Sequence, residues 1–64
     1  MKPEPGSLWH HKAKNRYYEV VTVANDQADW HNKNWLKIVV YKESFNGNIW
    51  ARPLVEFLEK FEEC

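Results

Sequence analysis

The sequence predicts a mainly-β domain, either a small barrel or a sheet covered on both faces, with a short helix at its C-terminal end. Two long segments, 16–24 and 35–43, consist largely of β-branched and aromatic residues, which favour strands. An Asn-Gly pair at 46–47 follows the second segment and is typical of a hairpin turn. After Pro53 the apolar residues recur at helical spacing, which predicts the helix.

The chain begins with a segment of turn-forming composition. Residues 1–6 hold two prolines and a glycine, so we expect a flexible lead-in there and a single domain over 7–64. That domain should open with a short strand at 7–12 and a turn at 13–15.

The segment 16–24 is the clearest predicted strand. Successive side chains of a strand point to opposite faces, so Tyr17 and Tyr18 lie on different faces, and each face carries further apolar residues. Two apolar faces favour a barrel or a sheet covered on both sides. A polar ten-residue loop at 25–34 follows and contains one large apolar residue, Trp30. We expect Trp30 either to close the end of the core or to lie exposed as a contact.

The segment 35–43 is predicted to pair with 48–52 through a tight type I′ turn at Asn46 and Gly47, because both residue types tolerate positive φ. Pro53 suits the first helical position, where its missing N–H costs no hydrogen bond. One face of the helix is formed by Leu54, Phe57, Leu58 and Phe61. The predicted core consists of Tyr18, Val20, Val39, Ile49, Leu54, Phe57 and Leu58.

The formal net charge is zero, but it is unevenly distributed. Residues 1–42 carry seven Lys/Arg against four Asp/Glu (+3), and residues 43–64 carry two against five (−3). A nucleic-acid-binding domain usually has a basic excess overall, so nucleic-acid binding is disfavoured. The distribution predicts a mildly basic face and an acidic helix, which can attract each other or a second copy of the chain.

Signals for catalysis, cofactors and metals are lacking, so we expect no enzyme, no cofactor and no metal site. Neither serine lies in a nucleophile elbow, and two glycines cannot form a phosphate-binding loop. The three histidines and Cys64 do not fall at a zinc-binding spacing. The neighbours His10 and His11 point to opposite faces of a strand, so they cannot chelate one ion.

A cytoplasmic protein is the expectation for localisation. The single cysteine cannot form an internal disulfide, which favours a reducing compartment. The first residues contain no apolar signal segment, and the longest apolar run, 38–41, is far shorter than the roughly 20 residues of a membrane span. No oligomeric state is predicted.

Three motifs (YYEVVTVA, IVVY and IWARPLVEFLE) resemble a family of short bacterial and phage proteins, domain-of-unknown-function family 1653. The resemblance covers about residues 5–60, and its most specific part is Trp-x-Arg-Pro-Leu-x-x-Phe. The matching residues are Pro5, Gly6, His10, Lys12, Tyr18, Val20, Ala24, Val39, Val40, Tyr41, Trp50, Arg52, Pro53, Leu54 and Phe57. It implies an SH3-like barrel or a strongly bent antiparallel sheet, and it implies no activity.

The candidate binding residues centre on Trp50 and Arg52, which lie two residues apart and therefore share a face of the last strand. Arg52 can stack on the indole, and it either pairs with Glu56, the favoured alternative, or faces an open, aromatic-lined hollow. The remaining candidates are His10, Lys12, Trp30 and Tyr41.

The sequence thus favours a non-enzymatic binding module for a protein or peptide partner, of which a phage-encoded modulator of a host protein would be one form. An alternative is a binder of a small, planar, anionic ligand such as a nucleotide, held against Trp50 with Arg52, His10 and Lys12 neutralising its charge. Nucleic-acid binding through residues 10–16 is a second alternative. No membrane partner is expected.

Overall fold

The structure, a computed structural model, describes residues 3–25 and 37–64. Five strands form one antiparallel sheet in the order β4-β3-β2-β1-β5. Their bounds are β1 Leu8–His11, β2 Arg16–Asn25, β3 Lys37–Glu43, β4 Ile49–Pro53 and β5 Phe61–Glu63, and helix α1 spans Leu54–Lys60.

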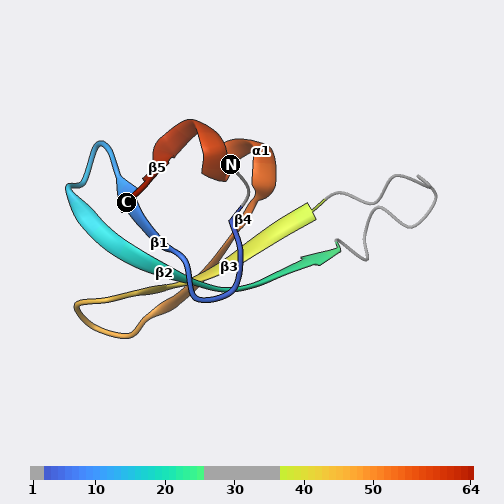
Figure 1. Cartoon of the computed structure of the whole chain (residues 1–64), viewed down its shortest axis with the longest axis horizontal. Coiled ribbons are helices and arrows are strands. Elements are labelled where there is room, and N and C mark those ends of the chain that lie inside the picture. Colours follow the sequence, from blue (N-terminus) through green and yellow to red (C-terminus); the bar gives the residue numbers. More distant parts are fainter. Residues whose placement is uncertain (1–2, 26–36) are drawn as a thin grey trace.

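Helix α1 links β4 at one edge of the sheet to β5 at the other, so it crosses one face of the sheet (Figure 1). We call this covered side the inner face. The domain is mainly β with a short C-terminal helix, as predicted. Of the two forms predicted, the open sheet is the one observed, because β4 and β5 do not pair in the described parts of the chain and the sheet is not closed into a barrel.

Strand β5 is the element that the sequence pattern did not predict. Phe61 continues the helical spacing, but its backbone is extended (φ −118°, ψ 150°) and α1 ends at Lys60. Residues 61–63 pair with the edge of β1, with Phe61 opposite His11. Pairing with β1 satisfies backbone groups along that edge, and Phe61 still reaches the core from the strand.

Strand β2 contains a β-bulge between Val20 and Thr22. Before the bulge, Tyr18 and Val20 face the core; after it, Val23 packs against the core and Thr22 is exposed. One inserted residue reverses the alternation of every residue that follows. The strict alternation read from the sequence is therefore wrong beyond position 21.

The hairpin between β3 and β4 has a longer loop than predicted. Gly47 has the expected positive φ (75°), but Asn46 does not, so the two-residue type I′ turn is wrong. The Gly47 N–H donates to the Glu43 carbonyl (2.8 Å), and the Glu43 N–H donates to the Asn48 carbonyl (2.9 Å). The Asn46 side-chain oxygen accepts a hydrogen bond from the N–H of Asn48 (3.0 Å), and this bond within the loop stabilises it.

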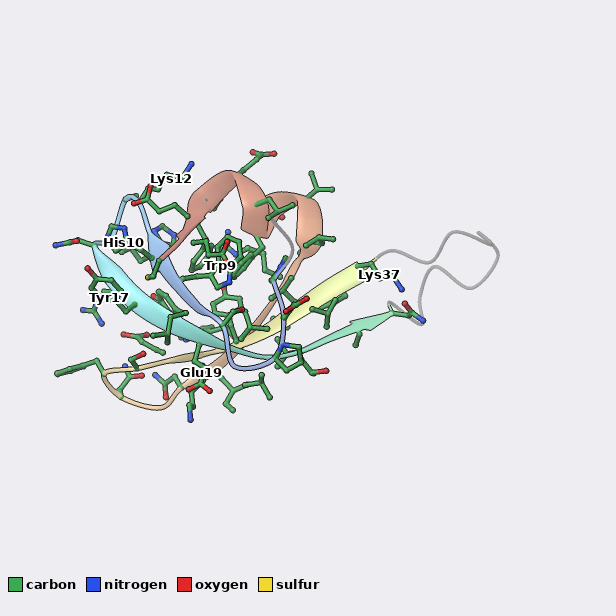
Figure 2. All side chains as sticks on the ribbon, in the orientation of Figure 1. Trp9, His10, Lys12, Tyr17, Glu19 and Lys37 are labelled. Atoms are coloured by element: carbon green, nitrogen blue, oxygen red, sulfur yellow. The ribbon has the colours of Figure 1, made fainter. Side chains whose placement is uncertain are left out.

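The core is an aromatic cluster between the sheet and α1. It consists of Trp9, Tyr18, Val20, Val39, Tyr41, Phe57 and Phe61. The rings of Phe57 and Phe61 stack at 4.2 Å, and Trp9 meets Phe57 edge to face at 5.2 Å. Figure 2 shows Trp9 below the helix, on the inner face.

Four predicted core residues (Tyr18, Val20, Val39 and Phe57) are buried, and Leu54 is partly buried. Two predictions are wrong: Ile49 is 60% exposed and Leu58 is 43% exposed. Ile49 lies opposite Lys42 on the outer face, because Trp50 and Arg52 occupy the inner-face positions of β4. The two-turn helix α1 fully buries one side chain, Phe57, so Leu58 lies at its flank.

Residues 3–6 of the predicted lead-in form a turn against β2. Pro3 is buried, and the Gly6 N–H donates to the Val20 carbonyl (2.8 Å). Within the described residues, no helix has the length and apolar character needed to cross a membrane.

Candidate functional site

Helix α1 leaves part of the inner face uncovered, and a hollow of about 120 Å³ lies there. We call it the arginine hollow. Aromatic rings of four strands (β2, β3, β4 and β5) line it together with polar groups from β1, the β1–β2 turn, β3 and β4. The residues used below are His11, Lys14, Tyr41, Glu43, Trp50, Arg52 and Phe61.

The sequence left two arrangements open for Arg52: pairing with Glu56, or facing an open hollow lined by aromatic rings. Arg52 combines the two. Its Nη1 donates to Glu56 Oε1 (3.2 Å) and its Nε donates to the Tyr41 hydroxyl (3.2 Å). The ring that it faces is Phe61, whose centroid lies 6.0 Å from the guanidinium carbon. Its Nη2 forms no hydrogen bond to the described residues, so Arg52 pairs with a helix glutamate and also lines the hollow with a nitrogen that no described residue uses.

Trp50 and Tyr41 are cross-strand neighbours on the inner face, but they differ in exposure. Tyr41 is buried, and its hydroxyl accepts from Arg52, so it supports the floor of the hollow. Trp50 lies on β4, at the edge of the sheet, and remains 49% exposed. Of the two sequence candidates, only Trp50 offers a large accessible surface.

His11 is a polar member of the hollow that the sequence did not single out. It is buried, and its Nδ1 accepts the backbone N–H of Lys14 (3.1 Å). Burial lowers the pKa of His11, and the nearby cations Lys14, Arg52 and Lys60 lower it further. The ring is therefore neutral at pH 7, and its proton is on Nε2. Strand alternation places His11 with Trp9, but no sequence signal shows which side chains face it.

Glu43 also lines the hollow, as a buried carboxylate. Arg16 Nη1 donates to its Oε2, from the strand directly beside it. A buried carboxylate needs such a partner, because desolvation without one is costly. The pair is formed across β2 and β3, 27 positions apart, and could not be predicted from spacing.

His10 and Lys12 lie away from Arg52 and Trp50. His10 is on the outer face, where Nδ1 contacts Glu62 Oε2 (3.1 Å) and Nε2 contacts Asn15 Oδ1 (2.8 Å). These acceptors, Asn15 first and Glu62 second, raise the pKa of His10. Figure 2 shows His10 beside Tyr17 and Lys12 in the β1–β2 turn. The ring centroids of His10 and Tyr17 are 5.0 Å apart. The structure thus separates the two basic candidates from the hollow.

Trp30 lies outside the described residues, so its predicted role stays a prediction.

A second, more open concavity of about 420 Å³ lies between the β1–β2 turn and the β3–β4 loop. We call it the aromatic groove, and it is lined by Asn15, Arg16, Tyr17, Ser44 and Phe45. Phe45 is 87% exposed and Tyr17 is 55% exposed. Phe45 gave no periodic signal because it lies in the loop, and loops are where exposed functional residues gather.

Metal ligands are not grouped anywhere in the described residues: no three His, Cys, Asp or Glu side chains come together there. Cys64 is a free, exposed thiol.

Comparison with known proteins gives one match. The searches of curated proteins and of solved structures returned no match. A family model described as "Protein of unknown function (DUF1653)" matches residues 7–63, nearly the whole chain. The motifs that carried the resemblance, including Trp50, Arg52 and Pro53, fall within this range, and the chain belongs to the DUF1653 family.

Proposed function

We propose that this protein is a non-enzymatic binding module whose partner is a protein or peptide, bound at the arginine hollow and the adjoining edge of β4. The observation that carries the proposal is Trp50, a half-exposed tryptophan that lines the hollow together with Arg52. Tryptophan and arginine are enriched among the residues that dominate binding energy at protein interfaces.

The size of the arginine hollow favours a peptide over a nucleotide. Pockets that enclose small organic ligands are about 300–1,000 Å³, whereas this hollow is about 120 Å³. That volume accommodates one side chain of a partner rather than a base with its sugar and phosphates. The rest of such a partner would lie outside the hollow, against Trp50.

Strand β4 suits an extended partner. It is an edge strand, paired with β3 on one side and with no other strand in the described residues. An added peptide strand would gain main-chain hydrogen bonds along this edge, and alternate side chains would face the hollow. The exposed, free thiol of Cys64 is compatible with a reducing compartment, and we propose that the partner is met in the cytoplasm.

The small anionic ligand remains a second candidate, at a different place from the one predicted. The aromatic groove, about 420 Å³, lies within the size range of small-molecule sites and combines Tyr17 and Phe45 with Arg16. A nucleotide would stack there rather than on Trp50. Single-stranded nucleic acid would use the same rings together with the cations of residues 10–16.

The test compares two neighbouring residues of β4 that face opposite sides of the sheet. Trp50→Ala removes the inner-face ring, and Ile49→Ser changes an outer-face residue of similar exposure. A partner is captured from lysate on the wild-type protein, purified, and its affinity for each variant is measured by calorimetry. We expect Trp50→Ala to weaken binding by 2 kcal/mol or more, about thirtyfold, and Ile49→Ser to leave it nearly unchanged.

Equal affinity of both variants for every purified partner would contradict the proposal. In parallel, nucleotides and a short single-stranded oligonucleotide are added in a thermal-shift assay. A ligand that binds only the folded state raises Tm. A rise that is abolished by Phe45→Ala, and retained in Trp50→Ala, would favour the aromatic groove instead.

A further inference from the structure

We propose that the arginine hollow is an oxyanion subsite that accepts one carboxylate, from an acidic side chain of the peptide partner, through donors of Arg52, His11 and Lys14. The source of the carboxylate rests on the proposed function. The subsite itself rests on the geometry of the hollow.

The hollow collects hydrogen-bond donors from three separate elements. Arg52 contributes Nη2, which forms no bond to the described residues. His11 contributes the N–H of Nε2, because its Nδ1 accepts the backbone N–H of Lys14. The Lys14 side chain lines the hollow from the β1–β2 turn, and no ion pair joins it to a described residue. A carboxylate has two oxygens with about four acceptor positions, so it can use all three.

The charge of the lining matches a single negative charge. Lys14 and Arg52 contribute +2 and Glu43 contributes −1, giving +1; including the partners Arg16 and Glu56 leaves the sum unchanged. A carboxylate brings this sum to zero. A phosphate dianion would overshoot it and would lie near the buried Glu43, so the carboxylate is favoured.

The walls of the hollow strengthen such an interaction. Phe61 lies under the guanidinium, Tyr41 is a buried ring of the lining, and Trp50 lines the hollow from β4. Charges interact more strongly where the local dielectric is low, as it is beside these buried rings. Arg52 is already oriented by Tyr41 and Glu56, so little side-chain freedom is lost when a carboxylate binds.

His11 provides a direct spectroscopic readout. It lies among three cations that lower its pKa, so an anion bound beside it should raise that pKa. Reciprocity requires the anion to bind more tightly when His11 is protonated. The ring signals of His11 are followed by NMR through a pH titration, with sodium acetate as the probe and sodium chloride keeping the ionic strength constant.

Acetate is expected to raise the pKa of His11 saturably and to shift the indole signal of Trp50. Acetamide, which has nearly the same shape and no charge, should do neither. Inorganic phosphate should act more weakly than acetate. Equal responses to acetate and acetamide would overturn the subsite, and a stronger response to phosphate would overturn its assignment to a carboxylate.

Three variants test whether acetate binds in the arginine hollow. Arg52→Gln should weaken acetate binding by about tenfold, the loss of one charged hydrogen bond. Lys14→Gln changes an exposed turn residue, so the fold should persist while acetate binding falls a few-fold. Lys42→Gln, on the outer face, is the matched control and should bind acetate like the wild type. An unchanged acetate response in Lys14→Gln and in folded Arg52→Gln would overturn the proposal.

The experiments distinguish failure of the proposed function from failure of the carboxylate subsite. Acetate bound as described, without a peptide partner that depends on Trp50, would leave the subsite standing and remove the proposed function. A partner that depends on Trp50, with no acetate response at His11, would remove the subsite and leave the proposed function standing.

Discussion

At the scale of single residues, Arg52 shows how one side chain can stabilise the fold and still serve a site. Two of its three nitrogens donate to Tyr41 and Glu56, and its guanidinium carbon lies over the ring of Phe61. The exposed pair with Glu56 contributes little by itself, since solvent screens it. Its value is orientation, because it restricts the guanidinium of a residue that lines the hollow.

The two neighbouring histidines of β1 face opposite sides of the sheet, and their pKa values are shifted in opposite directions. The pKa of His10 is raised above its usual 6.5 by Asn15 and Glu62. Its contribution to stability is therefore complete below about pH 6.5 and is lost as the pH rises through the higher folded-state pKa. The pKa of His11 is lowered by burial, so its contribution is complete above about pH 6.5 and is lost as the pH falls through the lower folded-state pKa.

Thermal melts across this pH range test the direction in which each histidine's contribution to stability changes with pH. His10→Gln should destabilise the protein most at mildly acidic pH, where His10 is protonated, and least in alkaline buffer. His11→Phe keeps a ring in the core and removes the buried titrating group, so its Tm relative to wild type should improve as the pH falls. Parallel pH profiles for both variants and the wild type would contradict the assignment of opposite environments.

At the scale of elements, the β3–β4 hairpin depends on one backbone conformation. Gly47 has φ of 75°, and a β-carbon added there would meet no atom within 4 Å. The cost of a substitution therefore comes from the left-handed backbone rather than from a clash. This loop also positions Phe45 beside the aromatic groove.

Gly47→Val should lower the free energy of unfolding by about 1–2 kcal/mol, the cost of the left-handed conformation for an ordinary residue. Gly47→Asn should cost clearly less, because asparagine tolerates this region. Urea unfolding of the two variants gives the comparison. Equal stability of the two variants would show that the loop does not need the left-handed conformation.

At the scale of the whole molecule, the fold depends on one helix docked over the centre of an open sheet. Phe57 is fully buried and contacts the rings of Trp9, Tyr41 and Phe61. Because a chain of this size buries only about 60% of its unfolded surface, the loss of one such side chain removes a large share of the core.

Phe57→Ala should lower the free energy of unfolding by about 3–5 kcal/mol, which is enough to unfold much of the protein at room temperature. Leu58→Ala is the matched control one position along α1, and it should cost about 1 kcal/mol because Leu58 is partly exposed. Circular dichroism during thermal unfolding distinguishes the two. A Phe57→Ala protein that melts within a few degrees of Leu58→Ala would show that α1 does not dock as described.

The sequence by itself determined the elements whose signals are local. Strands β2, β3 and β4, the positive φ of Gly47, the change from strand to helix next to Pro53 and the burial of Phe57 all follow from residue type and periodicity. The prediction that Pro53 is the first helical residue is wrong, because Pro53 ends β4 with an extended ψ of 142° and α1 begins at Leu54. Tertiary structure alone decided β5, the bulge in β2 and the contents of the arginine hollow. Phe61 fits helical spacing equally well, and only the free edge of β1 makes its extended conformation favourable. Arg52 lies far along the chain from His11 and Lys14, so only strand order and register bring it to the same hollow. Periodicity records which face of an element is apolar, but it carries no information about what that face meets.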